Sequence, residues 1–551
     1  MSSPRPPEEG PFDLVVCADV VHTMTADPGS GDGESAVNAV AIRDGRIAAI
    51  GSREELVAGA ARVHDIGNGC ITPGLVDAHI HPIFGLELAR GADLSSVTSS
   101  EELTAALKAE ALAQPEGWVL GWGLDPRFIV GRNIGAVDLD PAVPERPTFV
   151  RIFDAHSGVL NTAGIAAAGV TGTEVFRSSA RVDLHPDGSP TGFLVEWQAM
   201  ALATETIPPP PLAERVDAMY AVLAGMADAG LTGGQVLDYA PGMFEVLEAA
   251  EQRGELPIRL FISPWVQAGD PAERVQEVID LQGRHGRKWA IRGVKLMIDG
   301  TIDNGSAWLE WPDVNGQSTG PLFLDPAEYT AIVHQLSALG IPTTTHAIGD
   351  AGIRHVVESI GSAPDSRRRH RVEHIETAPD ETLAGFVRHQ IAASMQPTHC
   401  TLFCSASGED NWSRRLGDVR VSRAWRLRSL VDAGVPVALG SDWPIAPYPP
   451  LPIMADAQLR RQAGHLDQEP ILAHEAIDAR AALAGYTSVR ADSWGDQERG
   501  RLVVGAVADL SLFSADLLTT APDDLLDVRV LGTVVDGVLR TPLSRRPPQS
   551  R

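Results

Sequence analysis

Hydrophobic residues in the middle of the chain fall into short runs that alternate with stretches of helical periodicity. Eight of these runs are five to eight residues long and have few charged positions, which is typical of buried strands in a parallel sheet. The predicted strands are residues 74–79, 232–237, 258–263, 291–298, 341–346, 371–375, 391–396 and 435–441. Helices that begin at prolines are predicted between some of them, at 211–229, 271–285 and 326–339. This alternation predicts an α/β fold and, with eight strands, a (β/α)8 barrel.

The two ends of the chain show a different pattern, in which short hydrophobic runs are joined by tight turns. Asp44-Gly45 and Asp536-Gly537 are typical hairpin turns. The runs beside these turns predict strands at 13–18, 36–42, 46–51, 508–513, 528–535 and 537–540. Since neither end is long enough for a sandwich alone, we expect one composite β-sandwich domain from both termini. The expected division is 11–72 with 500–541 for this domain, 73–87 with 211–499 for the barrel, and disordered tails at 1–10 and 542–551.

More than a hundred residues separate the first predicted barrel strand from the second, which breaks the alternation. This interval, 88–210, contains predicted strands at 118–124 and 148–153, and it ends in a stiff, proline-rich run at 207–211. We interpret it as an inserted subdomain. An insertion at the strand-end face of a barrel commonly shapes or covers the active site.

Composition and net charge limit the classes of partner and the cellular location that can be expected. The 551-residue chain is 44% hydrophobic and has a formal net charge of -27, which disfavours binding to nucleic acid or to anionic membranes. We expect a small-molecule substrate, with a homodimer as an open possibility. The sequence has no apolar run of about 18 residues and no signal-peptide pattern at its start, so a cytoplasmic location is predicted.

The four cysteines are too few and too scattered for a disulfide framework. Cys400 and Cys404 form a CxxxC pair beside His399, but a zinc knuckle would need further ligands at matched spacing. Two buried or loop cysteines are the simpler interpretation.

Four histidines stand at the ends of predicted strands. His79 and His81 are two residues apart, so in a strand both project to the same side, about 7 Å apart. His346 and His374 are separated by about one βα unit, which places them at the ends of neighbouring strands. Each of these residues alone is more often a core or surface histidine, but four in this arrangement suggest metal ligands.

Two further residues suggest chemistry at the same face. Asp442 follows an apolar strand, where an ionised carboxylate is costly unless it meets a metal or a cation, and it could also act as a general base. The structural alternative is that Asp442 caps the N-terminus of a helix. Lys295 is one of only three lysines beside 42 arginines, and it lies within an apolar strand. Unlike arginine, a desolvated lysine can lose its proton and react with carbon dioxide to form a carbamate. The alternative is a lysine that buries its aliphatic stem and extends its charged end to solvent.

Motifs spread over almost the whole chain resemble the amidohydrolase superfamily, and within it family 3, the YtcJ-like branch that includes N-substituted formamide deformylases. They are ITPGLVDAHIH, DAHSGVLN, DGSPTGFLVE, GVKLMIDG, THAIGD, RVEHIE, SMQPTH, ALGSDWPI and GRLVVGAVADLSLF. The resemblance implies a distorted (β/α)8 barrel, the composite β-sandwich and a site with one or two Zn²⁺ ions.

Position by position, the resemblance implies roles for the six residues already singled out. His79 and His81 bind one metal, a carboxylated Lys295 bridges to a second, His346 and His374 bind the second, and Asp442 is both ligand and base. Other motif residues plausibly face the substrate or hold the ligands, although each could equally be structural. They are His156, Asp299, His399 and, because it adjoins Asp442, Trp443.

These observations lead to a functional hypothesis. We expect a metal-dependent hydrolase that cleaves a non-peptide C–N bond, in an amide, an N-substituted formamide or a cyclic amide, with a metal-activated hydroxide. A lyase or decarboxylase on the same barrel, or a catalytically silent binding protein, is the alternative. The sequence does not choose the exact substrate, the number of metals or the oligomeric state.

Overall fold

The computed structural model describes residues 11–25, 37–129, 132–238, 240, 242–364 and 370–542. The disordered tails predicted at 1–10 and 542–551 lie outside these residues, except Pro542. The α/β class is confirmed, because parallel strands alternate with helices through most of the chain. None of the helices described is long and apolar enough to span a lipid bilayer.

Two parallel sheets form the centre of the molecule. The first has the order β16-β15-β14-β7 and the second β17-β18-β19-β20-β21. Their strands are β7 (Leu75–Ile80), β14 (Leu231–Val236), β15 (Arg259–Ile262), β16 (Trp289–Ile291), β17 (Val294–Met297), β18 (Thr343–Ala347), β19 (Arg371–His374), β20 (Ala392–Met395) and β21 (Val437–Leu439). Isolated parallel bridges, Ile80 to Trp443 and Trp265 to Lys295, join the two sheets at both edges. Each of the eight predicted strands overlaps one of these, and the fourth predicted run divides into β16 and β17.

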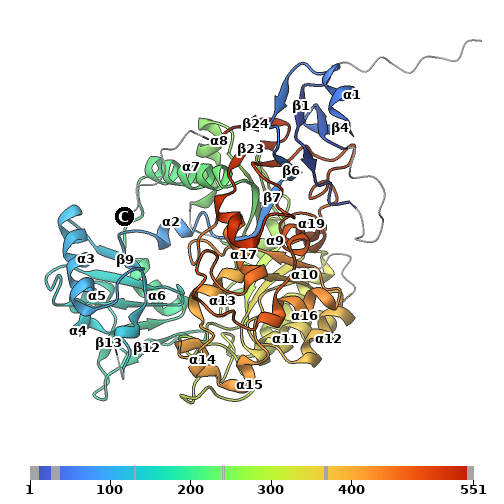
Figure 1. Cartoon of the computed structure of the whole chain (residues 1–551). Helices are drawn as coiled ribbons and strands as arrows, with labels where there is room; N and C mark the ends of the chain where they lie inside the picture. Colours follow the sequence, from blue (N-terminus) through green and yellow to red (C-terminus); the bar gives the residue numbers. More distant parts are fainter. Residues whose placement is uncertain are drawn as a thin grey trace, which may run out of the picture.

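Helices surround these sheets, as Figure 1 shows for the lower right of the molecule. They include α7 (Leu212–Asp228), α8 (Met243–Arg253), α9 (Ala272–Asp280), α10 (Pro326–Ala338), α11 (Asp350–Gly361), α12 (Asp380–Arg388), α16 (Leu427–Asp432), α17 (Pro450–Leu459), α18 (Ala479–Tyr486) and α19 (Ser488–Trp494). Helix α9 ends five residues earlier than predicted. The reason is that Gly283 adopts φ +84° and the chain then turns back, with an antiparallel bridge between His285 and Ala290.

The inserted segment forms a lobe beside the parallel sheets (Figure 1). Its six-stranded sheet has the order β12-β13-β11-β10-β9-β8. The elements are β8 (Ala92–Asp93), α3 (Ser100–Ala113), β9 (Val119–Leu124), α4 (Ala136–Leu139), β10 (Thr148–Ile152), β11 (Ser157–Leu160), α5 (Thr162–Ala168), β12 (Arg181–Leu184), β13 (Pro190–Val195) and α6 (Trp197–Thr204). Because side chains alternate along β10, Val150 and Ile152 pack in one apolar cluster, while Phe149 packs in another on the opposite face.

The two ends of the chain share a third packed region. One sheet, β4-β3-β1-β5, comes from the N-terminal part alone, and the other, β2-β6-β22-β23-β24, combines both ends. The strands are β1 (Leu14–Cys17), β2 (Val20–Val21), β3 (Ala39–Arg43), β4 (Arg46–Gly51), β5 (Val63–Asp65), β6 (Cys70–Pro73), β22 (Leu510–Phe513), β23 (Val530–Val535) and β24 (Val538–Arg540). Val16, Ile42, Leu512 and Val534 pack in one cluster, so residues far apart in sequence bury one another. The predicted domain boundaries stay a prediction.

His370, just before β19, provides a test of the packing. It is 3% exposed, its Nδ1 accepts a hydrogen bond from the Thr343 backbone N–H, and burial lowers its pKa to about 4. The unfolded chain therefore binds more protons than the folded chain between about pH 6.5 and pH 4, so the neutral His370 makes stability fall as pH falls through this window.

We predict that His370→Gln weakens this acid sensitivity. From pH 6.5 toward 4 the parent protein should lose up to about 1.4 kcal/mol more unfolding free energy per pH unit than the variant. Urea denaturation at a series of pH values measures this difference. Parallel curves for the two proteins would contradict the assignment.

Candidate metal centre

The six residues predicted as metal ligands lie together at the carboxyl ends of the parallel strands. His79 is in β7, Lys295 in β17, His346 in β18 and His374 at the end of β19. His81 and Asp442 follow β7 and β21 closely. All six side chains line one pocket, and none of the six residues is more than 9% exposed. The carboxyl-end face is where parallel barrels commonly place their active sites.

The distances show how closely these groups approach one another. Ligand atoms of His79, His374 and Asp442 lie within 4.8 Å of one another, which is close enough for one metal ion. Asp442 Oδ1 is 3.0 Å from His81 Nε2 and 3.3 Å from His79 Nε2. Lys295 Nζ is 3.4 Å from His79 Nε2, and the His346 and His374 rings are 4.5 Å apart between centroids. The strand ends therefore bring all six predicted ligands into one cluster.

A buried chain of charges orients His79. Glu373 accepts a hydrogen bond of 2.8 Å from His79 Nδ1, which leaves Nε2 directed at the cluster. The other Glu373 oxygen accepts a hydrogen bond of 2.6 Å from Arg371 Nε, and Arg371 Nη2 donates to the Ala78 carbonyl. All three side chains are fully buried. A carboxylate on the remote nitrogen of a ligating histidine fixes its tautomer and makes it a better ligand.

Asp442 is held by the contact between the first and last strands. Its backbone N–H donates to the His79 carbonyl at 2.7 Å, and the Asp77 carboxylate accepts from the N–H groups of His79 and Ser441. Asp442 has φ +61° and His374 has φ +72°, both unusual for residues with a side chain. Such conformations cost about 1–3 kcal/mol each, so the surrounding structure must impose them. The N-cap alternative for Asp442 does not apply, because no helix begins at this residue.

Burial controls the protonation of the cluster. It lowers the pKa of His79, His346 and His374 well below the usual value, so all three imidazoles are neutral at pH 7. Burial also lowers the pKa of Lys295, to about 8, and this lysine is 2% exposed rather than snorkelling. For Asp442 burial acts in the opposite direction, but the hydrogen bond from His81 and the nearby charges leave its pKa below normal.

These properties fit a divalent metal ion. Neutral imidazoles and an ionised carboxylate are the donor set that Zn²⁺ prefers. In addition, His81 Nδ1 and His374 Nδ1 are buried without a hydrogen-bonding partner among the described residues, so nitrogen donors remain available beside Asp442. The residues present therefore suit a metal chemically as well as geometrically.

The remaining pocket wall is largely apolar and encloses about 730 Å³ of space, including the part open to solvent. His156 and His399 line it, as the sequence predicted. His156 Nδ1 is 2.9 Å from Glu196 Oε2, and although burial alone would lower the pKa of His156, Glu196 raises it to about 9. His399 Nε2 is 3.6 Å from Asp442 Oδ2.

Two other predicted substrate contacts lie elsewhere. Asp299 is fully buried but does not line the pocket, because its carboxylate accepts hydrogen bonds from the backbone N–H groups of Trp308, Ile348 and Gly349. This network makes Asp299 a support for the loop after His346. Trp443 lines an adjoining cavity instead, and its carbonyl accepts from the His81 N–H.

Cys400 and Cys404 do not form a metal site. All four are free and buried, and no candidate metal-binding group in the described part of the chain includes Cys400 or Cys404. Arg460 Nη2 donates a hydrogen bond of 3.4 Å to Cys400 Sγ. The interpretation as two buried cysteines agrees with this placement.

Three residues in or beside the pocket were not singled out from the sequence. Glu373 stood in the quoted RVEHIE motif, where a charge inside a buried strand was the available signal. Glu196 is 40 residues from its partner His156, and nothing local reveals that pairing. Trp265, which packs edge-on to His81 at 5.8 Å between ring centroids, also gave no signal.

The chain is similar in sequence to known proteins over most of its length. The chain is 27% identical over 514 residues to the putative amidohydrolase YtcJ of Bacillus subtilis, covering 91% of this chain and 95% of that protein. It is 26% identical over 532 residues to the N-substituted formamide deformylase of Arthrobacter pascens, covering 92% and 95%.

A structural comparison finds the same fold in an uncharacterized metal-dependent hydrolase from Pyrococcus horikoshii OT3. That match has a TM-score of 0.70 at 21% identity and covers 92% of this chain and 99% of the other. The sequence profile of the amidohydrolase family matches residues 62–540. Since this match spans most of the chain, the protein belongs to the amidohydrolase family.

Proposed function

We propose that this protein is a metal-dependent hydrolase that cleaves a non-peptide C–N bond in a small molecule. The observation that carries the proposal is the cluster of neutral histidines around the ionised Asp442 in one buried pocket. In this proposal the two parallel sheets correspond to a distorted (β/α)8 barrel and the terminal sheets to a composite β-sandwich. The pocket walls suit an amide, an N-substituted formamide or a cyclic amide with apolar substituents.

The proposed metal is Zn²⁺, one or two per chain. His79, His81, His346, His374 and Asp442 would hold it, and a divalent ion in such a site polarises a carbonyl oxygen and makes water acidic near pH 7. Lys295 is close enough to His79 to share the site, and as a carbamate it would offer two oxygens between two ions. Its burial and lowered pKa supply the neutral amine that carbamate formation needs.

Asp442 is the proposed general base. Its carboxylate accepts the proton from the attacking water and then gives it to the leaving nitrogen. The nitrogen therefore leaves as a neutral amine and not as an anion. His156 and His399 face the same space and would hold substrate oxygens. The apolar wall around them excludes water, which strengthens each electrostatic contact.

The first prediction from the proposed function concerns Asp442→Asn. The amide cannot accept the proton, so kcat should fall about 10²- to 10⁴-fold on the best substrate of a panel of N-substituted formamides, simple amides and lactams. Metal content should be measured in parallel by elemental analysis. Full activity in a variant that retains its metal would contradict the role of Asp442 as base.

A second prediction concerns the metal itself. Dialysis against a chelator should abolish activity, and added Zn²⁺ with bicarbonate should restore it if Lys295 is carboxylated. Elemental analysis before and after reconstitution gives the stoichiometry, and Lys295→Ala should lower it if this residue bridges two ions. Full turnover by fully metal-free protein would contradict the metal-dependent mechanism.

A third prediction concerns Glu373→Gln. The glutamine cannot orient His79 as a carboxylate does, and it leaves Arg371 without its counter-charge, so metal affinity should fall about 10- to 100-fold. Competition with a fluorescent zinc chelator measures this affinity. Glu381→Gln, on the exposed start of α12, is the matched control and should bind metal normally. Equal affinities for the two variants would show that Glu373 does not support the metal centre.

A further inference from the structure

A buried arginine that forms no ion pair with any described residue lies beside the metal pocket. Arg151, in β10 of the inserted lobe, is 8% exposed, and its Nη1 is buried without a hydrogen-bonding partner. No ion pair or side-chain hydrogen bond joins its guanidinium to any residue that the structure describes. Instead it lies 5.3 Å from the ring centroid of Phe149 and 5.8 Å from that of Phe84.

This isolation sets Arg151 apart from the other buried arginines in the described part of the chain. Each of those donates at least one hydrogen bond to a carboxylate, amide or backbone oxygen. They are Arg371, Arg420, Arg460 and Arg490.

Keeping an unpaired cation out of water is costly, and no carboxylate among the described residues forms an ion pair with Arg151. Burial lowers the pKa of Arg151 to about 10, so the guanidinium is still charged at neutral pH. Glu87 is the acid that acts on it, but its carboxylate already lies 3.2 Å from Arg90 and 3.7 Å from Arg215. A charged group that is retained in this state suggests an anion supplied from outside.

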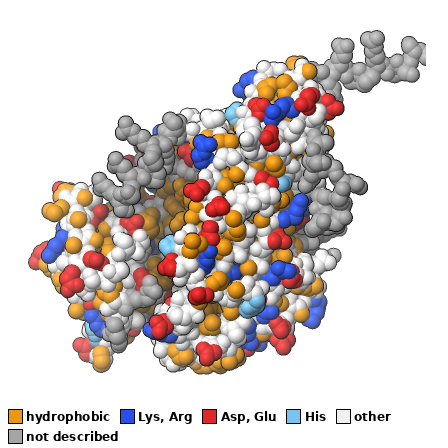
Figure 2. Space-filling view, viewed as in Figure 1, with side chains coloured by type: hydrophobic (Ala, Val, Ile, Leu, Met, Phe, Trp, Pro, Cys, Tyr) orange, Lys and Arg blue, Asp and Glu red, His pale blue; other side chains and the backbone are white. Residues whose placement is uncertain are grey.

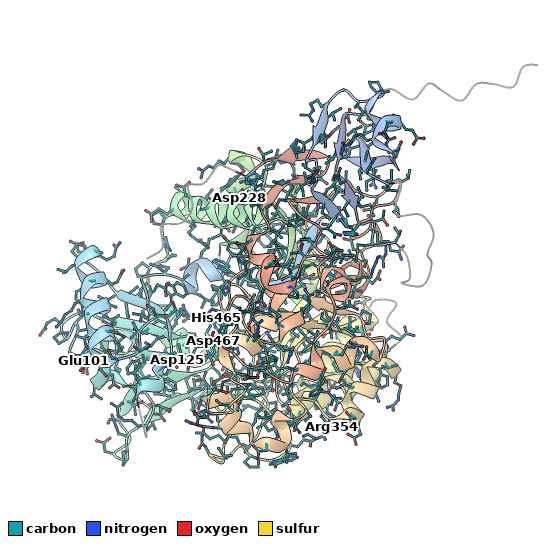
Figure 3. All side chains as sticks on the ribbon, viewed as in Figure 1. Glu101, Asp125, Asp228, Arg354, His465 and Asp467 are labelled. Carbon is teal, nitrogen blue, oxygen red and sulfur yellow. The ribbon has the colours of Figure 1, made fainter. Side chains whose placement is uncertain are left out.

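The position of Arg151 connects it to the catalytic face. It lines two cavities of the lobe, one with Phe84, Phe149 and Glu87, and the other with Trp122, Trp443 and Tyr448, which lies toward the loop after β21. Asp125, which lines this second cavity, is labelled on the lobe in Figure 3, and Figure 2 shows where the lobe meets the main body. This second cavity and the metal pocket share Leu88, Phe153, Ala155, Phe403 and Ile445. A single ligand can therefore extend from one into the other.

We infer that Arg151 binds a carboxylate group carried by the substrate, separated by an apolar segment from the bond that is cleaved. The inference rests on the proposed function and specifies its substrate class. A guanidinium and a carboxylate form two parallel hydrogen bonds, and the Phe153 and Phe403 rings suit the apolar segment between them. One guanidinium matches a monoanion, whereas Asp93 and Asp125 in the same cavity disfavour a phosphate dianion.

The test compares pairs of amide substrates that differ only in a terminal carboxylate or carboxamide. The parent protein should prefer the carboxylate by about tenfold or more in kcat/KM, and Arg151→Met should lose this preference. Arg181→Met removes an exposed arginine on β12 of the same lobe that lines neither cavity, so it should keep the preference. An unchanged preference in Arg151→Met would overturn the inference. Activation of carboxamide turnover by free 4-phenylbutanoate would also overturn it, because the carboxylate would then belong to an effector.

Binding and stability provide readouts that do not need turnover. Calorimetry on the zinc-loaded protein should detect 4-phenylbutanoate at least about tenfold more tightly than 4-phenylbutanamide, and Arg151→Met should abolish the difference. If this holds while no amide is cleaved, the carboxylate site stands and the proposed hydrolysis fails. Replacing an unpaired buried charge by an apolar side chain should leave the melting temperature unchanged or raise it. A clear fall, with no change in carboxylate binding, would show that Arg151 is merely structural.

Discussion

The hydrogen-bonded chain from Arg371 through Glu373 to His79 is the interaction on which the metal centre depends. Its charges are fully removed from water, so the arrangement is stable only while each group keeps its partner. It directs one nitrogen of His79 toward Asp442 and uses the other to join β7 to β19 across the interior. The geometry of the site and the packing of the parallel strands are therefore parts of one structure.

The sequence predicts most of the fold because each strand carries its own signal. Runs of apolar residues with polar ends mark the eight strands within a few residues, and the Asp-Gly pairs mark hairpin turns, with φ +52° at both Asp44 and Asp536. Helix ends are harder to place. Pro271 is the N-cap residue of α9 and not its first helical residue. The helix stops at Asp280 because a glycine and a local β-bridge follow it, and helical periodicity does not reveal either.

The predicted ligands could be found because strand ends in a parallel sheet meet at one edge, so position along the sequence determines position in space. The residues that support these ligands cannot be located from their position along the sequence. Glu373 reaches His79 across 294 positions and Glu196 reaches His156 across 40, so both pairings depend on how the strands are ordered. Asp299 shows the opposite case. It is a motif residue that was expected to face the substrate, but its carboxylate accepts hydrogen bonds from backbone N–H groups instead.

Burial explains why this chain, otherwise rich in arginine, has lysine at position 295. Removal from water disfavours every charged form, so it keeps the histidines neutral and ready to bind a metal, and it also brings the lysine toward its neutral, nucleophilic form. Arginine does not respond in this way, because its guanidinium stays protonated even when buried. At Arg151 the same burial leaves a lasting positive charge, which attracts an anion. One physical condition thus gives opposite results at the two residues, an amine closer to its neutral form among the predicted metal ligands and a fixed cation in the cavity beside them.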